Sequence, residues 1–305
     1  KNLCDSLLLR DDINLKIITS VEMKDKMSSF YSNHPYKDCL NLQDVAFGQE
    51  KLNFIMPFHP ASHDIYKISN SNIFQIIYDF SFHFCPELKD GNIKFEKSIL
   101  RSLNSKSHAL CISKKTRNDL LSISDIEPRK VGVFYPGLRD DLISDREKKI
   151  DKKDFSVKKF LKIPEDSKYV LCLSTLEPRK NLETSLKIFE NLISKFKLKK
   201  LYLVLTGAKG WGKSEEFIKM LPYEIRKKII LTGYVDDKIV YSLYKSCLCF
   251  LYPSFYEGFG LPPLESMARG TPVVISDRGS LPEIFGSVTK VFDPYDIHGM
   301  SSIIS

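Results

Sequence analysis

Short apolar runs alternate with amphipathic segments along most of this chain. Within residues 181–196, for example, apolar side chains recur at intervals of three and four, which predicts a helix. Short apolar strands separated by helices are typical of parallel sheets that are covered on both faces. The pattern therefore predicts an α/β protein. Strands are expected at residues 15–19, 52–56, 73–78, 109–113, 131–135, 169–173, 201–206, 229–232, 247–252 and 272–276, and further helices at 93–103, 115–121, 215–226 and 238–245.

The alternation stops between Pro136 and Pro164, where the chain is polar, rich in charge and without periodicity. We therefore place a domain boundary near residue 140, between an N-terminal domain (1–140) and a C-terminal domain (141–305). Two doubly wound, Rossmann-like domains facing across a cleft are expected, with ligands at the carboxyl ends of the strands. Residues 1–12 read as the end of an amphipathic helix and the chain stops within an expected helix, so we expect both ends to be truncated.

The segment 254–270, SFYEGFGLPPLESMARG, carries the most chemistry. Glu257 and Glu265 lie eight positions apart, separated by a Gly-Phe-Gly loop and a Pro-Pro helix start. A strand, a glycine loop and a helix N-terminus present free backbone N–H groups and a positive dipole end to an anion. Carboxylates beside an anion site make sense if they accept hydrogen bonds from hydroxyl groups. The combination predicts a pocket for a nucleotide sugar.

A second motif, EPRKN, spans residues 177–181, where the strand 169–173 leads into the next helix. The guanidinium group of Arg179 offers a fork of hydrogen-bond donors, and the ammonium group of Lys180 adds a compact positive charge beside it. Together they suit the oxygens of a diphosphate. Taken alone, the pair is better explained as basic residues at a helix start. Together with the two-glutamate segment, it favours phosphate binding.

These motifs resemble those of the family-4 retaining glycosyltransferases of the GT-B fold, whose signature has two glutamates eight positions apart. The resemblance covers nearly the whole chain, is strong between residues 169 and 294, and is weaker before residue 73. The C-terminal segments that carry it are 170–192, 203–212, 229–237 and 271–286, and the N-terminal ones are 76–88 and 109–121.

The resemblance implies roles for individual residues. Arg179 and Lys180 neutralise the leaving diphosphate, Glu257 lies by the donor sugar ring, and Glu265 binds the ribose hydroxyls. Backbone N–H groups of the glycine loop hold sugar hydroxyls and the distal phosphate, and the edge after strand 229–232 binds the base. Gly207 lets the nucleotide approach closely, although a glycine that simply ends a strand is the alternative. The loop residues are Gly258, Phe259, Gly260 and Leu261, and those of the base edge are Tyr234 and Val235.

One position departs from the family pattern. The family usually has His-Asp at the end of an N-terminal strand, on the sugar or acceptor side, where this chain has Tyr78 and Asp79. A tyrosine donates one hydrogen bond but does not titrate near neutral pH. Either the chemistry needs no imidazole, or the choice of sugar is altered, or activity is weak. His83 could substitute, but a histidine in an aromatic run is more often a packing residue.

The implied activity is retaining transfer of a hexose from a nucleotide-diphosphate sugar to a glycan or lipid-linked acceptor in surface polysaccharide synthesis. GDP-mannose is the favoured donor. No Asp-x-Asp pair occurs in the sequence, so we expect no metal and no other cofactor. A nucleotide-sugar epimerase fits the two motifs less well. A non-catalytic sugar-nucleotide-binding domain of a larger polysaccharide-assembly protein is the alternative from another class.

Composition adds further bounds. The chain has 305 residues and a net charge of +8, much of it from the basic segment 146–162. A solvated linker between domains is the simpler explanation of that segment. Attraction of its basic residues to an anionic membrane surface is the more specific alternative. No nucleic-acid-binding motif accompanies the charge, so nucleic acid is not expected as a partner. No apolar run is long enough to span a membrane, and seven cysteines without metal-type spacing favour a reducing cytoplasm. We expect a cytoplasmic protein, with a peripheral position at the inner face of the membrane as an option.

Overall fold

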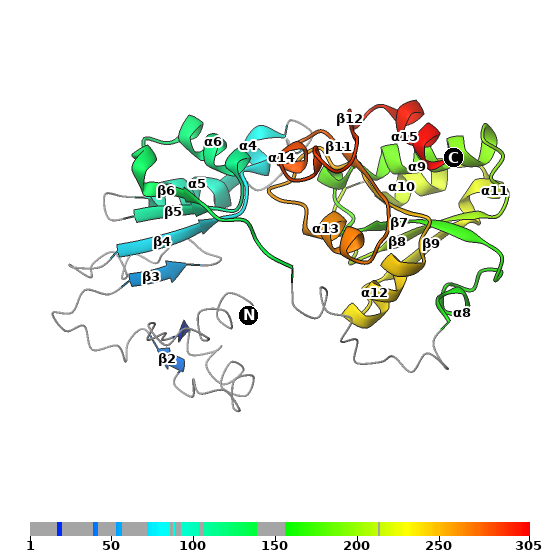
Figure 1. Ribbon diagram of the computed structural model, residues 1–305, viewed down its shortest axis with the longest axis horizontal. Helices are drawn as coiled ribbons and strands as arrows, with labels where there is room; N and C mark the ends of the chain where they lie inside the picture. The colour runs from blue at the N-terminus through cyan, green and yellow to red at the C-terminus, as the bar shows by residue number, and fades with distance from the viewer. Residues whose placement is uncertain are drawn as a thin grey trace. The chain divides into compact units, whose positions relative to one another are not determined.

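The computed structural model describes residues 17–19, 39–41, 53–56, 72–85, 88, 93–103, 107–138, 156–212 and 214–305 (Figure 1). The chain divides into two compact units, one of Lys1–Asn53 with Ser62–Asn72 and one of Phe54–Ala61 with Ile73–Ser305. In the first unit, β1 (Ile17–Thr19) pairs in parallel with β2 (Cys39–Asn41). The predicted domain boundary near residue 140 falls in the range 139–155, outside the described residues, and stays a prediction.

A six-stranded sheet forms the centre of the C-terminal half. Its strand order is β12-β11-β10-β7-β8-β9, and every neighbouring pair is parallel. Alternate side chains along β7 and β8 enter two separate cores, as a strand's period of two requires. Val170 packs in one core while Leu171 packs in the other. The strands are β7 (Lys168–Leu173), β8 (Leu201–Thr206), β9 (Ile229–Gly233), β10 (Cys249–Tyr252), β11 (Val273–Ser276) and β12 (Val291–Phe292).

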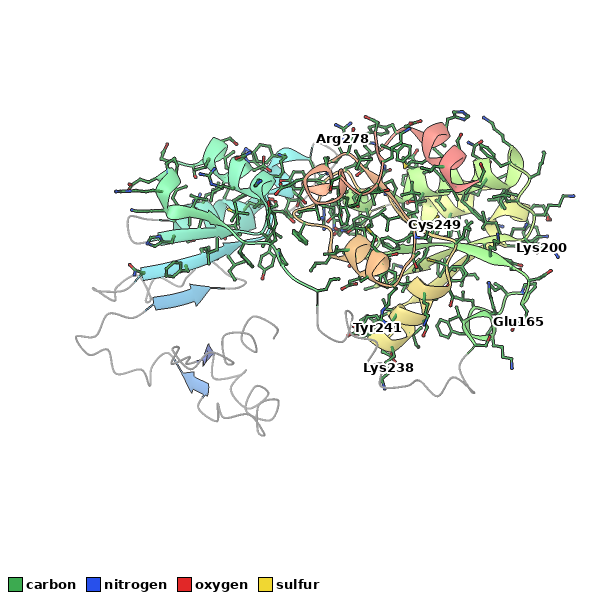
Figure 2. All side chains as sticks on the ribbon, in the orientation of Figure 1. Glu165, Lys200, Lys238, Tyr241, Cys249 and Arg278 are labelled. Atoms are coloured by element: carbon green, nitrogen blue, oxygen red, sulfur yellow. The ribbon has the colours of Figure 1, made fainter. Side chains whose placement is uncertain are left out.

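Helices cover both faces of this sheet (Figure 1). Helices α9 (Leu182–Ser194), α10 (Ser214–Met220), α11 (Tyr223–Arg226) and α15 (Ile297–Ile304) contribute to the first core. The second core is closed by α8 (Val157–Leu161), α12 (Asp237–Ser246), α13 (Leu261–Ala268) and α14 (Leu281–Phe285). Cys249 is buried in the sheet, whereas charged side chains such as Lys200 lie at the surface (Figure 2).

A four-stranded sheet lies in the N-terminal half, in the order β3-β4-β5-β6. The pairs β4–β5 and β5–β6 are parallel. Its core includes Ile77, Ala109 and Cys111 from the strands and Leu120 from a covering helix. The elements are β3 (Asn53–Met56), β4 (Asn72–Ile77), β5 (Ser107–Cys111), β6 (Val131–Val133), α4 (Ser81–Phe84), α5 (Ile93–Ser102) and α6 (Lys114–Ile123).

The α/β prediction is confirmed, and most predicted elements lie within a few residues of their expected places. The helix predicted at 215–226 is wrong, because the chain forms α10 and α11 there instead. Pro222 is the N-cap of α11, and a proline cannot continue a preceding helix. The expected linker also contains α8, whose Leu161 is buried and whose Lys158 donates to Ser167 O, so this part is not a solvated linker.

Candidate functional site

The loop that follows β10 places Glu257 at the carboxyl end of the six-stranded sheet. Strands β7 and β10 are neighbours, so the loops that follow them meet at the same edge. The β10 loop ends at Gly260, the N-cap of α13, whose φ of 94° suits glycine. Two prolines then occupy the first turn of α13, where a missing N–H costs little. The predicted strand, glycine loop and helix are thus present.

The carboxylate of Glu257 bonds to both cations of the EPRKN motif. Lys180 Nζ lies 2.6 Å from Glu257 Oε1, and Arg179 Nη1 lies 3.0 Å from Glu257 Oε2. Glu257 is only 6% exposed, and the side chains of Arg179 and Lys180 are 18% and 13% exposed. The structure therefore brings together the three residues that were predicted to be catalytic, as a buried ion cluster.

Glu257 is ionised in this cluster at neutral pH. Burial alone would raise the pKa of Glu257, but the positive charges of Lys180 and Arg179 outweigh it and lower the pKa to about 2. Burial acts to lower the pKa of Arg179, but Glu257, Asp79 and Glu177 raise it overall. Both Arg179 and Glu257 therefore keep their charges in the folded protein.

Two partners of the cations were not anticipated from the sequence. Glu177 Oε1 lies 2.7 Å from Arg179 Nη2, and the Tyr252 hydroxyl lies 2.7 Å from Lys180 Nζ. Glu177 is the first residue of the EPRKN motif and Tyr252 the last residue of β10. Their places beside the two motifs are the only signal that could have found them.

Asn181 ties the EPRKN turn to two loops. Its φ of 54° is left-handed, a conformation that asparagine tolerates better than most residues. Its Oδ1 accepts the Thr184 N–H at 3.3 Å and caps α9. Its Nδ2 donates to the carbonyl oxygens of Pro253 and Pro294 at 3.0 and 3.1 Å. Asn181 therefore fixes Arg179 and Lys180 relative to the β10 loop.

The backbone of Glu257 is held from a second direction by the turn before α14. Ser280 donates to Glu257 O from both its N–H and its hydroxyl, at 2.9 and 3.0 Å. A Cβ at Gly279 would lie 2.3 Å from Glu257 O and 2.5 Å from Glu257 N, and the φ of Gly279 is +60°. Only glycine fits this close approach, so Gly279 and Ser280 are site residues that the sequence analysis missed.

Glu265, the second glutamate, lies on α13. It accepts a hydrogen bond from the buried Tyr244 hydroxyl at 3.1 Å. Burial and the nearby Glu265 raise the pKa of Tyr244 well above its usual value, so Tyr244 remains a donor. The tyrosine fixes one oxygen of Glu265.

The glycine loop packs against the end of β4. A Cβ at Gly258 would lie 2.1 Å from Tyr78 O, so the loop backbone touches the predicted sugar or acceptor side directly. The Phe259 ring is buried in a cluster with Ile76 and Ile112, which is a packing role, and Leu261 is exposed at the start of α13. Asp79 Oδ1 accepts the N–H of Ser81, the first residue of α4, at 3.0 Å. Tyr78 is 41% exposed.

The predicted base edge lies at the ends of β8 and β9. Tyr234 is 81% exposed and Val235 is half-buried against the second core. Gly207 donates to Gly233 O at 3.0 Å and has a φ of +139°, and its Cβ would lie 2.1 Å from Ser174 O. The close approach of this backbone accounts for a glycine at 207, and its role in nucleotide approach stays a prediction.

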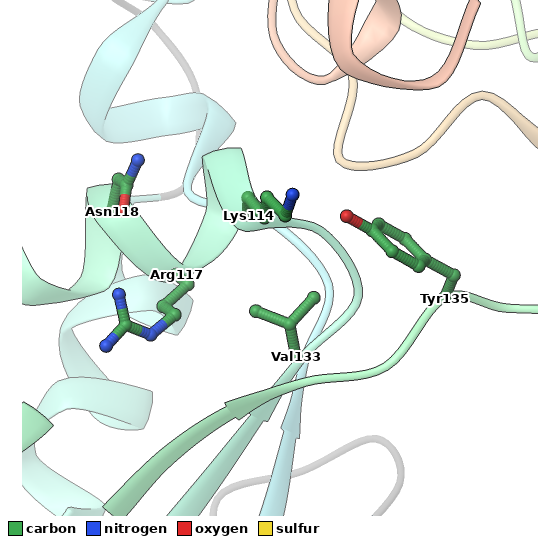
Figure 3. A pocket seen from close by; sticks show the side chains of 5 residues that line it. All are labelled: Lys114, Arg117, Asn118, Val133 and Tyr135. Atoms are coloured by element: carbon green, nitrogen blue, oxygen red, sulfur yellow. The ribbon is translucent and has the colours of Figure 1, made fainter. Parts of the chain in front are cut away.

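A pocket of about 500 Å³ lies beside α6 and β6 (Figure 3). It is lined by Lys114, Arg117, Asn118, Val133 and Tyr135. The sequence analysis singled out none of these five residues. In the described part of the chain, no group of three or more His, Cys, Asp or Glu side chains is arranged to hold a metal ion, and no helix is long and apolar enough to cross a membrane.

Residues 154–304 match the family model described as glycosyl transferases group 1. The chain is 32% identical over 230 residues to the O-antigen chain mannosyltransferase B of Escherichia coli, covering 74% of this chain and 58% of that protein. It is 24% identical over 260 residues to the O-antigen chain mannosyltransferase RfbU of Salmonella typhimurium, covering 85% of this chain and 65% of that protein. It thus spans about three fifths of the length of these relatives.

Among solved structures, the fold is similar to that of WaaG, a glycosyltransferase involved in lipopolysaccharide biosynthesis. The TM-score is 0.62 at 15% identity, over 96% of this chain and 76% of that one. The parallel strand pairs of the two larger sheets and this likeness confirm the prediction of a GT-B fold.

Proposed function

We propose that the protein transfers a hexose from a nucleotide-diphosphate sugar, since residues 154–304 match the family model of glycosyl transferases group 1. The acceptor is a glycan or a lipid-linked glycan in surface polysaccharide synthesis. Mannose is the favoured sugar, in line with the names of the two O-antigen relatives, and we propose GDP-mannose as its donor. The observation that carries the proposal is the convergence of Arg179 and Lys180 on Glu257 at the edge where α/β sheets bind ligands.

In this proposal Arg179 and Lys180 hold the diphosphate of the donor. Both cations are bonded to Glu257, and a diphosphate offers them more anionic oxygens than one carboxylate. Glu265 accepts hydrogen bonds from the ribose hydroxyls, and Tyr244 holds it for that purpose. The N–H groups of Gly258 to Leu261 bind the sugar and the distal phosphate, and Tyr234 and Val235 bind the base.

The reaction we propose proceeds with retention at the anomeric carbon. The bond between that carbon and the leaving phosphate oxygen breaks, and a bond to the acceptor oxygen forms on the same face. The acceptor proton passes to the leaving phosphate oxygen, whose charge Arg179 and Lys180 stabilise, so neither a metal nor another cofactor is required. Glu257, ionised at neutral pH, lies by the developing positive charge of the sugar ring. Tyr78 and Asp79 lie on the sugar or acceptor side.

A donor screen with purified protein tests this proposal. GDP-mannose, UDP-sugars and dTDP-sugars are each incubated with the protein, and released nucleoside diphosphate is measured with and without EDTA. We expect turnover with one base class, unchanged by EDTA. The Lys180→Ala variant should lose turnover more than affinity, since its charge acts on the leaving group. No turnover with any donor, or full loss with EDTA, contradicts the proposal.

Tyr78 supports an alternative, because it stands where the family usually has histidine. The chain could then be a non-catalytic sugar-nucleotide-binding domain of a larger polysaccharide-assembly protein. Tight binding of a nucleotide sugar without hydrolysis or transfer in the screen above would favour this alternative.

We also propose a cytoplasmic protein at the inner face of the membrane, supported by the eight basic and three acidic residues of segment 146–162. Lys158 of this segment is engaged with Ser167 O, so its remaining basic residues would carry the attraction. Sedimentation with vesicles that contain anionic lipid should show binding that weakens with salt, and equal binding to neutral vesicles would contradict it.

A further inference from the structure

Tyr256 anchors the β10 loop to the four-stranded half of the molecule. Its buried hydroxyl donates a hydrogen bond to the carboxylate of Asp119, a residue 137 positions away on α6. Its ring packs with Cys85 and Leu88, which follow α4. Because Tyr256 immediately precedes Glu257, this anchor acts on the residue next to the buried carboxylate.

The acceptor of this hydrogen bond is itself fixed. Asp119 is buried, and its second oxygen accepts a hydrogen bond from Lys115 Nζ, one turn earlier on α6. The same ammonium group lies 5.5 Å from the centroid of the Tyr256 ring and 5.1 Å from that of Phe84. The Tyr256 hydroxyl therefore meets a carboxylate whose position is held by its neighbours.

The backbone of Tyr256 links this anchor to the cations of the candidate site. Its carbonyl oxygen accepts a hydrogen bond from Arg179 Nη1 at 3.1 Å, and the same nitrogen bonds to Glu257 Oε2 at 3.0 Å. A movement of Tyr256 would therefore be felt by both Arg179 and Glu257.

A second tie runs from α6 to the turn that holds Glu257. Glu283 on α14 accepts the N–H groups of Lys114 and Lys115 at 2.8 and 2.9 Å, at the first turn of α6. Ser280, the N-cap of the same α14, holds the carbonyl of Glu257. Helix α6 thus reaches Glu257 by more than one route, and the Tyr256 route depends on one hydrogen bond between two side chains.

We propose that the hydrogen bond between Tyr256 and Asp119 positions the Glu257 carboxylate against Arg179 and Lys180. Tyr256 and Asp119 are then positioning residues of the donor site, and the C-terminal ion cluster depends on the N-terminal sheet for its geometry. The effect on transfer rests on the proposed function, whereas the positioning of Glu257 involves only contacts within the protein. Misplacement by about 1 Å can cost about a hundredfold in rate.

The test removes one hydroxyl group and compares two tyrosines. Tyr256→Phe removes the bond to Asp119. Tyr169→Phe is the matched control. Tyr169 is also buried, and its hydroxyl donates to Leu243 O at 2.8 Å within the second core. Both changes lose the same atom from a buried site, and only the first one touches the β10 loop.

The first measurement is the pKa of Glu257, by carbon NMR of ¹³C-labelled glutamate carboxyl groups during an acid titration. We expect Tyr256→Phe to raise it by about one unit or more and Tyr169→Phe to leave it unchanged, since a looser contact with the cations stabilises the carboxylate less. Asp119→Leu, which removes the acceptor and keeps a side chain of similar size, should shift it in the same direction and serves if Tyr256→Phe fails to fold. An equal Glu257 pKa in Tyr256→Phe, Asp119→Leu and the control would overturn the proposal.

The second measurement is the steady-state rate of sugar transfer. Tyr256→Phe should lower kcat at least about tenfold with KM changed less than about threefold, because the hydroxyl acts on geometry in the transition state. A loss of kcat that Tyr169→Phe shares equally would mean a structural role only. If the unaltered protein transfers no sugar, the proposed function fails, while the pKa comparison still decides whether Tyr256 positions Glu257.

Discussion

Replacing Glu257 by glutamine keeps the shape of the side chain and removes its charge, so Arg179 and Lys180 lose their shared anionic partner. The pKa of Glu257 falls from 4.5 to about 2, a shift of about 2.5 units that corresponds to about 3 kcal/mol of stability at pH 7. Breaking a buried ion pair by removal of one partner costs about 3–5 kcal/mol, which agrees. We therefore expect Glu257→Gln to unfold about 6–12 °C lower than the unaltered protein.

A nucleoside diphosphate should reverse part of this loss. In the variant the two cations have no carboxylate to give up, so the anion gains more by binding there than in the unaltered protein. The assay is thermal unfolding at pH 7.5 with and without GDP, UDP or dTDP. We expect the ligand-induced rise in Tm to be larger in Glu257→Gln.

The control is Glu183→Gln, which removes a carboxylate from an exposed pair with Lys187 and should cost less than about 1 kcal/mol. The reasoning is refuted if Glu257→Gln is as stable as Glu183→Gln, or if the nucleoside diphosphate stabilises the Glu257 variant less than the unaltered protein.

Three further predictions concern stability and the shape of the site. Glu96 is buried and its pKa is raised to about 7, so the folded state binds a proton more tightly than the unfolded state and stability falls as pH rises from about 4.5 through 7. Glu96→Gln should remove that fall, which is worth about 2 kcal/mol between the two pH values of 5.5 and 8.5 in urea unfolding; an unchanged difference would contradict the assignment. Gly279→Ala should push the backbone of Glu257 aside and lower nucleotide affinity about tenfold or more. The control is Gly270→Ala, which is also at positive φ but has open space around it and should cost only about 1 kcal/mol of stability. Equal nucleotide affinities of the two variants by calorimetry would refute this. Asn181→Asp keeps a helix cap but sets a carboxylate against two backbone carbonyl oxygens. We expect the free energy of unfolding, measured in urea, to fall by about 1–3 kcal/mol. An unchanged free energy of unfolding would count against the role of Asn181 in joining the loops.

The sequence located the candidate site because that site depends on local patterns. Apolar runs predicted β7 and β10, and the loops after these strands carry the EPRKN motif and Glu257. The carboxyl ends of neighbouring parallel strands meet at one edge, but only the structure shows that β7 and β10 are neighbours. The expectation that Arg179, Lys180 and Glu257 serve one site came from the resemblance to the family. That the three form one ion cluster was not predicted, because motif spacing does not report which side chains are buried together.

Contacts between distant segments could not be found in this way. Tyr256 and Asp119 are 137 positions apart, and neither stands out by residue type. The glycine at 279 is also unremarkable in sequence, and only the folded backbone shows that it touches Glu257. Short elements such as β12, with two residues, and α14, with five, offer too few positions for a periodic pattern.

A crystal structure of the protein with a bound nucleotide-diphosphate sugar tests the central claim most directly. The account predicts the diphosphate oxygens within hydrogen-bond distance of Arg179 and Lys180, with Glu265 on the ribose and the sugar beside Glu257. A donor bound away from these two cations, or a diphosphate held by a divalent metal ion in their place, would contradict it.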